Sequence, residues 1–242
     1  MSFFRGTAWY YTRYRPGYPP ELIERLATAA GLDGTGRLLD LGTGTGLLAV
    51  ALAPHVDEVV AVDPEPEMLA ELPPGIRAVQ ARAEDVDESW GTFRLATIGR
   101  ALHWMDGPLV LDRLARITRQ LALVADTHED SEAQTSLLEI ARELLGERPA
   151  PQQPTVRYAE ALARSPFSDV LEITVEVERT WTIEQLIGYA YSTSFASLQR
   201  VGDRREEFER TVRERLKPSY RERVPVDALL GRRRDGFDSP GA

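Results

Sequence analysis

The stretch Asp40–Gly46 reads Asp-Leu-Gly-Thr-Gly-Thr-Gly and decides the fold. The apolar run Arg37–Leu41 leads into it, and the helix-like run Leu47–Ala53 follows it directly. A buried strand, a glycine turn and the start of a helix are therefore predicted in one segment. A turn of this kind lets a ligand approach bare backbone amides at the positive end of a helix.

A carboxylate stands at a matching distance along the chain. Val59–Val62 is predicted as a buried strand, and Asp63 ends it, about 20 residues after Gly42. In a doubly wound sheet this spacing puts an acidic side chain beside the ribose hydroxyls of a ligand. The same carboxylate can also cap the helix predicted over Pro64–Ala70. The two signals together predict an adenosine-containing ligand.

The spacing of the glycines restricts the class of ligand. Gly42, Gly44 and Gly46 give G-x-G-x-G, whereas the dinucleotide fingerprint needs its third glycine at the position of Leu47. No Gly-Lys-Ser/Thr follows, so the phosphate-binding Walker pattern is absent too. A ligand without a phosphate group fits this turn better.

Five segments in order carry a resemblance to a known family: Tyr11–Pro19, Leu39–Gly46, Val62–Leu69, Ala83–Asp85 and Ala101–Asp106. They resemble motifs of the class I S-adenosylmethionine-dependent methyltransferases, in the small-molecule branch often called type 11. The resemblance runs from about Tyr11 to Asp126. It implies S-adenosyl-L-methionine as the methyl donor and S-adenosyl-L-homocysteine as the product.

The predicted donor-binding residues come from the turn, the carboxylate and these motifs. The turn would hold the amino-acid half of the donor, the acid its ribose, and the later segments its adenine, while an N-terminal lid would cover it. The residues are Tyr11, Arg15, Gly42, Thr43, Gly44, Asp63, Pro64, Met68, Ala83, Glu84 and Gly99. Two alternatives stay open. The aromatic N-terminal segment can simply cover the core, and Glu84 can be one solvated acid among several.

His103 is the predicted catalytic base. It follows the predicted strand Leu95–Ile98, and ligands bind at the carboxyl ends of parallel strands. An imidazole titrates near neutral pH and can therefore take a proton from an acceptor. The alternative is a histidine packed beside Trp104. His55 is interpreted as structural.

No metal site is predicted. Side chains with oxygen and nitrogen ligand atoms do cluster after the predicted strand Leu121–Ala125. They are Asp126, His128, Glu129 and Asp130. Such a cluster could bind Mg²⁺, but loose carboxylates in a loop are usually solvated.

Some residues differ from the family pattern, and one of these differences, together with a set of aromatic residues, concerns the binding of the methyl acceptor. Arg94 replaces an acid before the fourth strand, Arg82 replaces a small residue, and Arg100 is a bulky cation near the predicted donor site. We expect Arg100 to select an anionic or polar acceptor. The aromatic residues Trp181, Tyr189, Tyr191 and Phe195 are expected to line the acceptor pocket or to belong to the core.

The order of apolar runs predicts an α/β fold, doubly wound, with a mostly parallel seven-stranded sheet and an inserted helical cap. A single domain is expected, with a lid and first helix over 1–30, a cofactor-binding core over 34–130, a cap with the sixth strand over 131–219, and a last strand and tail over 220–242. Leu171–Arg179 alternates as an edge or antiparallel strand. Thr182 with Gln185, and Asp203 with Glu206, predict capping boxes. Pro225 conflicts with an interior strand, so it predicts a bulge or a displaced strand.

Composition excludes several other classes of protein. The chain has 242 residues, a net charge of −9 and no cysteine, so thiolate chemistry and zinc–sulfur sites are excluded. The negative charge argues against a nucleic-acid partner, and Arg232–Arg234 is interpreted as part of a solvated terminus. No membrane span or signal peptide is recognised, so a cytoplasmic monomer or homodimer is expected.

These patterns predict an enzyme that methylates an oxygen or nitrogen of a small molecule, such as a secondary metabolite. Two alternatives remain. The first is a catalytically silent protein that binds S-adenosylmethionine or S-adenosylhomocysteine. The second is a nicotinamide-dependent oxidoreductase, which the missing third glycine disfavours.

Overall fold

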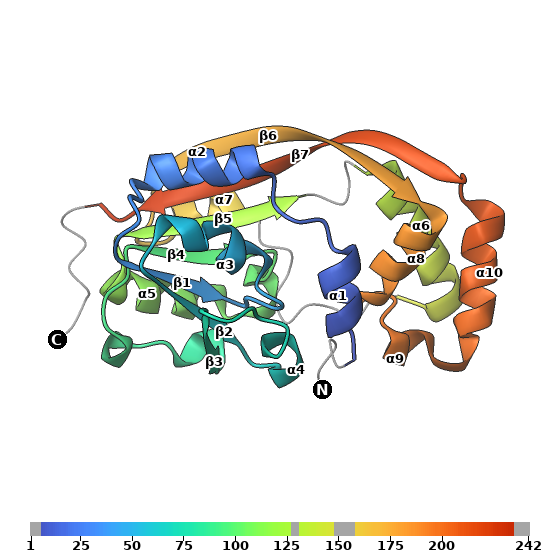
Figure 1. The fold of residues 1–242 in the computed structure, drawn as a ribbon, viewed down its shortest axis with the longest axis horizontal. Coiled ribbons are helices and arrows are strands. Elements are labelled where there is room, and N and C mark those ends of the chain that lie inside the picture. Colours follow the sequence, from blue (N-terminus) through green and yellow to red (C-terminus); the bar gives the residue numbers. More distant parts are fainter. Residues whose placement is uncertain (1–5, 127–130, 148–157, 235–242) are drawn as a thin grey trace.

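In residues 6–126, 131–147 and 158–234, which the computed structural model describes, seven strands form one sheet in the order β3-β2-β1-β4-β5-β7-β6 (Figure 1). Strands β1 to β5 are parallel, and β7 is antiparallel to both of its neighbours. The fold class predicted from the sequence is thus confirmed. The strands are β1 (Arg37–Leu41), β2 (Glu58–Asp63), β3 (Arg77–Gln80), β4 (Leu95–Gly99), β5 (Gln120–Asp126), β6 (Asp169–Thr182) and β7 (Ser219–Arg232).

Helices cover both faces of the sheet because successive strand residues point to opposite sides. Leu38 and Ala61 pack with helices α2 and α3, whereas Leu39 and Val60 pack with α5 and α7. The helices are α1 (Ala8–Tyr14), α2 (Pro20–Ala30), α3 (Leu47–Leu52), α4 (Pro66–Leu69), α5 (Gly107–Ile117), α6 (Glu132–Leu145), α7 (Tyr158–Ala163), α8 (Ile183–Tyr191), α9 (Leu198–Val201) and α10 (Arg205–Arg215).

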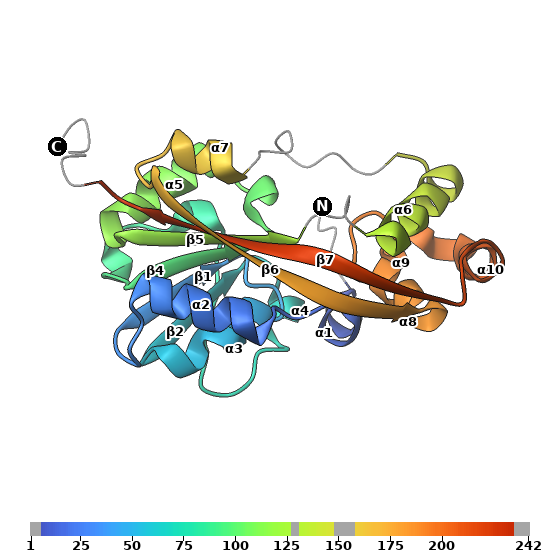
Figure 2. The same ribbon diagram turned by 90° about the horizontal axis from the view of Figure 1, so that it is seen from above.

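Strands β6 and β7 form a long antiparallel pair that extends beyond the rest of the sheet. A second group of helices lies at its far end (Figure 2). Helices α6, α8, α9 and α10 bury a core of their own, which includes Leu137, Leu186 and Phe208. Strand β6 is the predicted edge strand, and Ile173 and Val175 face inward as expected. Leu171 does not follow them, since it is 41% exposed.

Pro225 is accommodated without a bulge and without displacing the strand, so both alternatives predicted from the sequence are wrong. The β6–β7 register runs continuously from Val224 through Pro225 to Val226. On the other side of β7, the described pairing with β5 reaches Asp126 opposite Val226, next to Pro225. Pro225 itself stands opposite Glu176 of the edge strand β6.

Two of the helix starts expected from the sequence behave differently. The capping box of Thr182 and Gln185 forms at the start of α8, with both reciprocal hydrogen bonds present. The second box is wrong, because α10 begins at Arg205, after the short 3₁₀ turn Gly202–Arg204. Asp203 is thus already inside a helical turn rather than at a cap.

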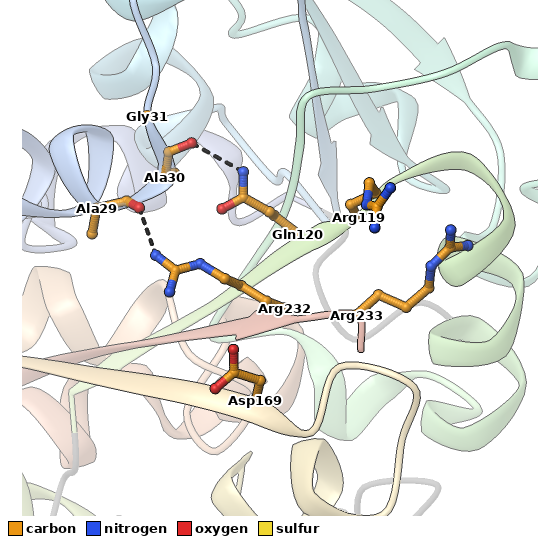
Figure 3. A pocket seen from close by; sticks show the side chains of 8 residues that line it. All are labelled: Ala29, Ala30, Gly31, Arg119, Gln120, Asp169, Arg232 and Arg233. Carbon is orange, nitrogen blue, oxygen red and sulfur yellow. Dashed lines mark hydrogen bonds between the residues drawn. The ribbon is translucent and has the colours of Figure 1, made fainter. Parts of the chain in front are cut away.

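The last carbonyls of α2 are bound by side chains from three other parts of the sheet. Arg232 donates to the carbonyl of Ala29 at 2.8 Å, and Gln120 donates to that of Ala30 at 3.0 Å (Figure 3). Arg94 donates to the carbonyl of Gly31. Cations and amides at this end satisfy orphan carbonyls and oppose the negative pole of the helix.

The arginine-rich C-terminal segment is therefore not simply solvated, which corrects the interpretation from sequence. Arg232 is bound as described, and Arg233 donates to the carbonyl of Ala115 in the last turn of α5. Both side chains line a cavity of about 470 Å³ at the amino end of β5 (Figure 3). Their contacts are those of helix C-caps.

Candidate donor-binding site

The glycine turn adopts a backbone that other residues reach only with strain. Gly42, Gly44 and Gly46 have φ values of 64°, 55° and 84°. A side chain at Gly42 would put its Cβ 2.7 Å from Cβ of Ala101 and 2.8 Å from Cε of Met105. At Gly44 the nearest atoms would belong to the Tyr11 ring, 3.8 Å away. The first glycine thus allows close packing, and the second lies against the Tyr11 ring.

Asp63 lies directly beside this turn, as its spacing predicts. Its carboxylate accepts hydrogen bonds from the backbone amides of Gly44 and Glu65, each at 2.9 Å. Burial raises its pKa, and the two hydrogen bonds oppose that rise. The bond from Glu65 holds the turn before α4, which begins at Pro66 rather than at the expected Pro64. A carboxylate has about four lone-pair sites, so two further donors can bind.

Asp40 is a buried acid of the site to which the sequence assigned no role. It is 1% exposed, and it accepts hydrogen bonds from the hydroxyls of Thr43 and Thr97, each at 2.6 Å. Burial raises its pKa to about 6 against the effect of these bonds. The carboxyl group thereby ties β1 to the glycine turn and to β4. The available signal was an acid within an apolar strand, since such residues are rarely buried without partners.

Tyr11 and Arg15 meet each other at the edge of the turn. The Tyr11 ring lies against Gly44, and the Arg15 guanidinium lies 5.0 Å from the centres of the Tyr11 and Tyr189 rings. Arg15 also donates to the carbonyl of Ser192 at 3.3 Å, while its Nε is buried without a hydrogen-bond partner in the part of the chain that the structure describes. A buried donor of this kind is suited to bind an anionic group.

The segment that carries His103 packs onto the same turn. The chain leaves β4 at Gly99 and bends at Arg100, which has a left-handed φ of 55°. His103 then lies in the 3₁₀ turn Leu102–Trp104, half-buried, with its ring centre 5.0 Å from that of Trp104. Because Ala101 and Met105 contact the space at Gly42, this turn is part of the site wall.

Arg100 and Gly99 fix the segment between α1 and α2. The Arg100 guanidinium donates to the carbonyl of Pro16 at 3.0 Å and lies 4.6 Å from the centre of the Tyr18 ring. A Cβ at Gly99 would stand 2.4 Å from the Tyr18 hydroxyl, so a larger residue there would have to displace the Tyr18 side chain. The cation near the end of β4 is thus held against the N-terminal segment.

The Glu84 side chain is held in place by hydrogen bonds, and its role at the edge of the adenine stays a prediction. Its carboxylate accepts from the backbone amide of Asp106 at 2.8 Å and from Arg82 at 3.2 Å. Burial raises its pKa, but these hydrogen bonds outweigh burial, and the net pKa is lowered. Of the neighbouring predicted residues, Ala83 and Met68 are buried, whereas Pro64 is exposed.

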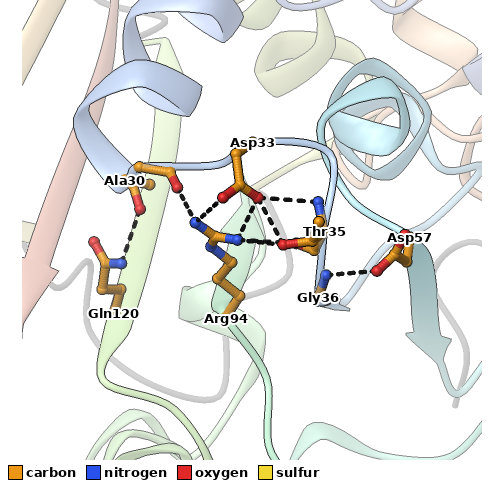
Figure 4. Close-up of polar contacts among 8 residues, drawn as sticks. Ala30, Asp33, Thr35, Gly36, Asp57, Arg94 and Gln120 are labelled. Atoms are coloured by element: carbon orange, nitrogen blue, oxygen red, sulfur yellow. Dashed lines mark hydrogen bonds and ion pairs between the residues drawn. The ribbon is translucent and has the colours of Figure 1, made fainter.

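Several predicted residues lie away from the turn. Trp181, Tyr191 and Phe195 are buried in the core of the helical group, which favours the core interpretation for them. Arg94 lies before the amino end of β4 and binds Asp33, Thr35 and Gly31 (Figure 4). It therefore does not disturb contacts near the donor.

The acidic and histidine side chains that could bind a metal ion lie partly within the described residues and partly outside them. In residues 6–126, 131–147 and 158–234, no group of three or more acidic or histidine side chains is placed to hold a metal ion. His128, Glu129 and Asp130 lie outside the described residues.

Comparisons with known proteins agree with this geometry. The family model described as a methyltransferase domain matches residues 38–122. Uncharacterized methyltransferases of Mycobacterium bovis and Mycobacterium tuberculosis are 33% identical over 192 residues, which cover 76% of this chain and 74% of theirs. The chain belongs to the class I S-adenosylmethionine-dependent methyltransferases.

This methyltransferase also resembles solved structures over nearly its whole length. A candidate type II methyltransferase from Anaeromyxobacter dehalogenans is 26% identical with a TM-score of 0.65, covering 90% of this chain and 98% of that one. A candidate methyltransferase of antibiotic biosynthesis from Anabaena variabilis shares the fold, at 15% identity and a TM-score of 0.58, over 87% and 96% of the two chains. Within the described ranges, no helix is long and apolar enough to cross a membrane.

Proposed function

We propose that this methyltransferase transfers the methyl group of S-adenosyl-L-methionine to an oxygen or nitrogen of a small molecule, such as a secondary metabolite. The observation that carries the proposal is the contact of Asp63 with the amide of Gly44, beneath the Tyr11 ring. One acid with free lone pairs thus stands beside a glycine turn whose backbone at Gly44 is covered, among the residues that the structure describes, only by the Tyr11 ring. Both features fit a nucleoside that has no phosphate group.

The residues would divide the donor between them. The turn Gly42–Gly44, with Thr43, would hold its amino-acid half, and Arg15 would pair with its carboxylate. Asp63 would accept from both ribose hydroxyls. Met68 and Pro64 would lie on the adenine, while Ala83 and Glu84 would bind its edge, and Gly99 would contact the donor through its backbone at the end of β4.

Bound donor would supply an electrophilic methyl group on a sulfonium, whose leaving group is already good. The chain's own residues then have to align the acceptor, exclude water and take up a proton. Tyr11 and Arg15 would close the site from the N-terminal side. His103 would accept the proton of an acceptor hydroxyl or ammonium group, and Arg100 would favour acceptors that are anionic or polar.

Product formation tests this proposal. The wild-type protein is incubated with donor that carries a tritiated methyl group, together with fractions of a metabolite extract, and labelled small molecules are sought. Formation of a labelled product and S-adenosylhomocysteine is expected. If the protein binds the donor tightly but labels nothing, the silent-binder alternative holds instead. Arg100→Ala should relax the preference between acidic and neutral acceptors, and unchanged turnover of both would contradict the role of Arg100.

A further inference from the structure

Helix α1 lies between the glycine turn and the helical group formed by α6, α8, α9 and α10, and it contacts both. On one side the Tyr11 ring lies against Gly44, and the amide of Gly6 donates to Glu67 of α4 at 2.7 Å. On the other side α1 packs along α8. Tyr10 and Tyr14 form that second face, one helical turn apart, as expected for positions i and i+4.

The contact between α1 and α8 is built on a glycine inside a helix. Gly188 lies in the middle of α8, where glycine is less favourable than alanine. A Cβ at Gly188 would stand 2.5 Å from Cγ and Cδ2 of the Tyr14 ring and 2.6 Å from Cδ1. These atoms belong to the inner half of a ring that lies against Tyr10, so the ring has little freedom to yield.

We propose that Tyr14 and Gly188 are positioning residues, which seat α1 on α8 and thereby hold Tyr11 over the glycine turn; this inference rests on the proposed function. The ring of Tyr14 occupies the space where a side chain at Gly188 would lie. One turn further along α8, the centres of the Tyr10 and Tyr191 rings lie 5.2 Å apart. The helical group thus sets the position of the lid.

Because α1 packs on α8 at Gly188, a methyl group added at Gly188 should change the affinity for the donor without contacting it. Gly188→Ala should strengthen α8 as an isolated helix, because alanine is the better helix former. It should also displace α1, because the new Cβ and the Tyr14 ring cannot occupy the same space. A change that keeps the fold but weakens donor binding separates positioning from a merely structural role.

The test compares S-adenosylhomocysteine binding by calorimetry in the wild type, Gly188→Ala, Tyr14→Ala and the double variant. Each single variant should raise Kd about tenfold, because α1 would no longer hold Tyr11 in its place over the glycine turn. The double variant should bind no more weakly than Tyr14→Ala, because without the ring the methyl group has nothing to displace. Tyr14→Phe, which keeps the ring, should bind like the wild type.

A matched control and a second readout keep the result interpretable. Gly17→Ala also replaces a glycine near the lid, but its Cβ would meet nothing within 4 Å, so Kd should not change. Trypsin should cleave after the exposed Arg13 faster in Gly188→Ala than in the wild type. Wild-type affinity in Gly188→Ala, or fully additive losses in the double variant, would overturn the inference. Absence of binding by the wild type itself would instead refute the proposed function.

Discussion

The carboxylate of Asp63, at the end of β2, accepts a hydrogen bond of 2.9 Å from the backbone amide of Gly44, in the turn after β1. Two signals that stand apart in the sequence therefore meet in one hydrogen bond. Because β1 and β2 are parallel neighbours, their carboxyl ends reach the same edge of the sheet. That edge is where the donor is proposed to bind.

Asp63→Asn should weaken S-adenosylhomocysteine binding. Asparagine keeps the size of the side chain but replaces one acceptor oxygen with a donor, and a hydrogen bond to a charged group contributes about 1.5–3 kcal/mol. Kd should rise about 10- to 100-fold. Asp57→Asn is the matched control, because Asp57 accepts from the amide of Gly36 at the same 2.9 Å but lies before the amino end of β2 (Figure 4). Equal losses of affinity in both variants would refute the ribose role of Asp63.

His103→Gln should slow turnover far more than it weakens donor binding. Loss of a general base costs about 10²- to 10⁴-fold in rate, whereas the affinity for S-adenosylhomocysteine should stay within about twofold. The measurements are the single-turnover rate with an accepted substrate and the calorimetric Kd. His55→Gln serves as control, since His55 lies near Glu24 on the sheet's other side. Parallel losses of rate and affinity in His103→Gln would assign this residue to structure.

Asp40 should make stability depend on pH in a direction opposite to that of most acids. Its pKa is raised to about 6, so the folded state holds a proton that the unfolded state has already released above pH 4. Stability contributed by this group is therefore lost as pH rises from about 4 to about 6, by about 3 kcal/mol. Urea unfolding of the wild type and Asp40→Asn at several pH values measures the difference. A difference that stays constant between pH 4 and 7 would contradict the raised pKa.

Arg94→Met should lower stability and leave donor affinity unchanged. Its guanidinium binds Asp33 and lowers the pKa of that carboxyl to about 2 (Figure 4). A lowered pKa gives stability that is present above about pH 4 and is lost as pH falls toward 2. The variant should therefore melt at a lower temperature than the wild type at pH 7, with a smaller gap in acid. Weaker binding of S-adenosylhomocysteine would show that Arg94 acts on the site after all.

Strands β1, β2, β4 and β5 of the parallel sheet were predictable because each one is a short apolar run. Strand β3, with the sequence Arg-Ala-Val-Gln at the edge of the sheet, gives a weaker signal. Arg37–Leu41 matches the predicted bounds, and β2, β4 and β5 differ only at their ends. The contradictions arise where neighbours decide the outcome. Whether Pro225 disrupts β7 depends on how β5 and β6 pair beside it, and no local pattern records that.

The candidate site was predictable where one residue type answers one chemical need. The glycine turn and the position of Asp63 beside it could be predicted from the motif and its spacing. Tyr14 and Gly188 could not be paired, because 174 positions separate the ring from the glycine against which it packs. A glycine within the helical pattern of Ile183–Tyr191 was the only local sign.

Calorimetric titration of the wild-type protein with S-adenosylhomocysteine, and separately with a nicotinamide dinucleotide, tests the central claim most directly. The account predicts saturable binding of the first ligand at one site per chain, weakened in Asp63→Asn and unchanged in Asp57→Asn, with no binding of the second. Heat only from the dinucleotide, or from neither ligand, would contradict it.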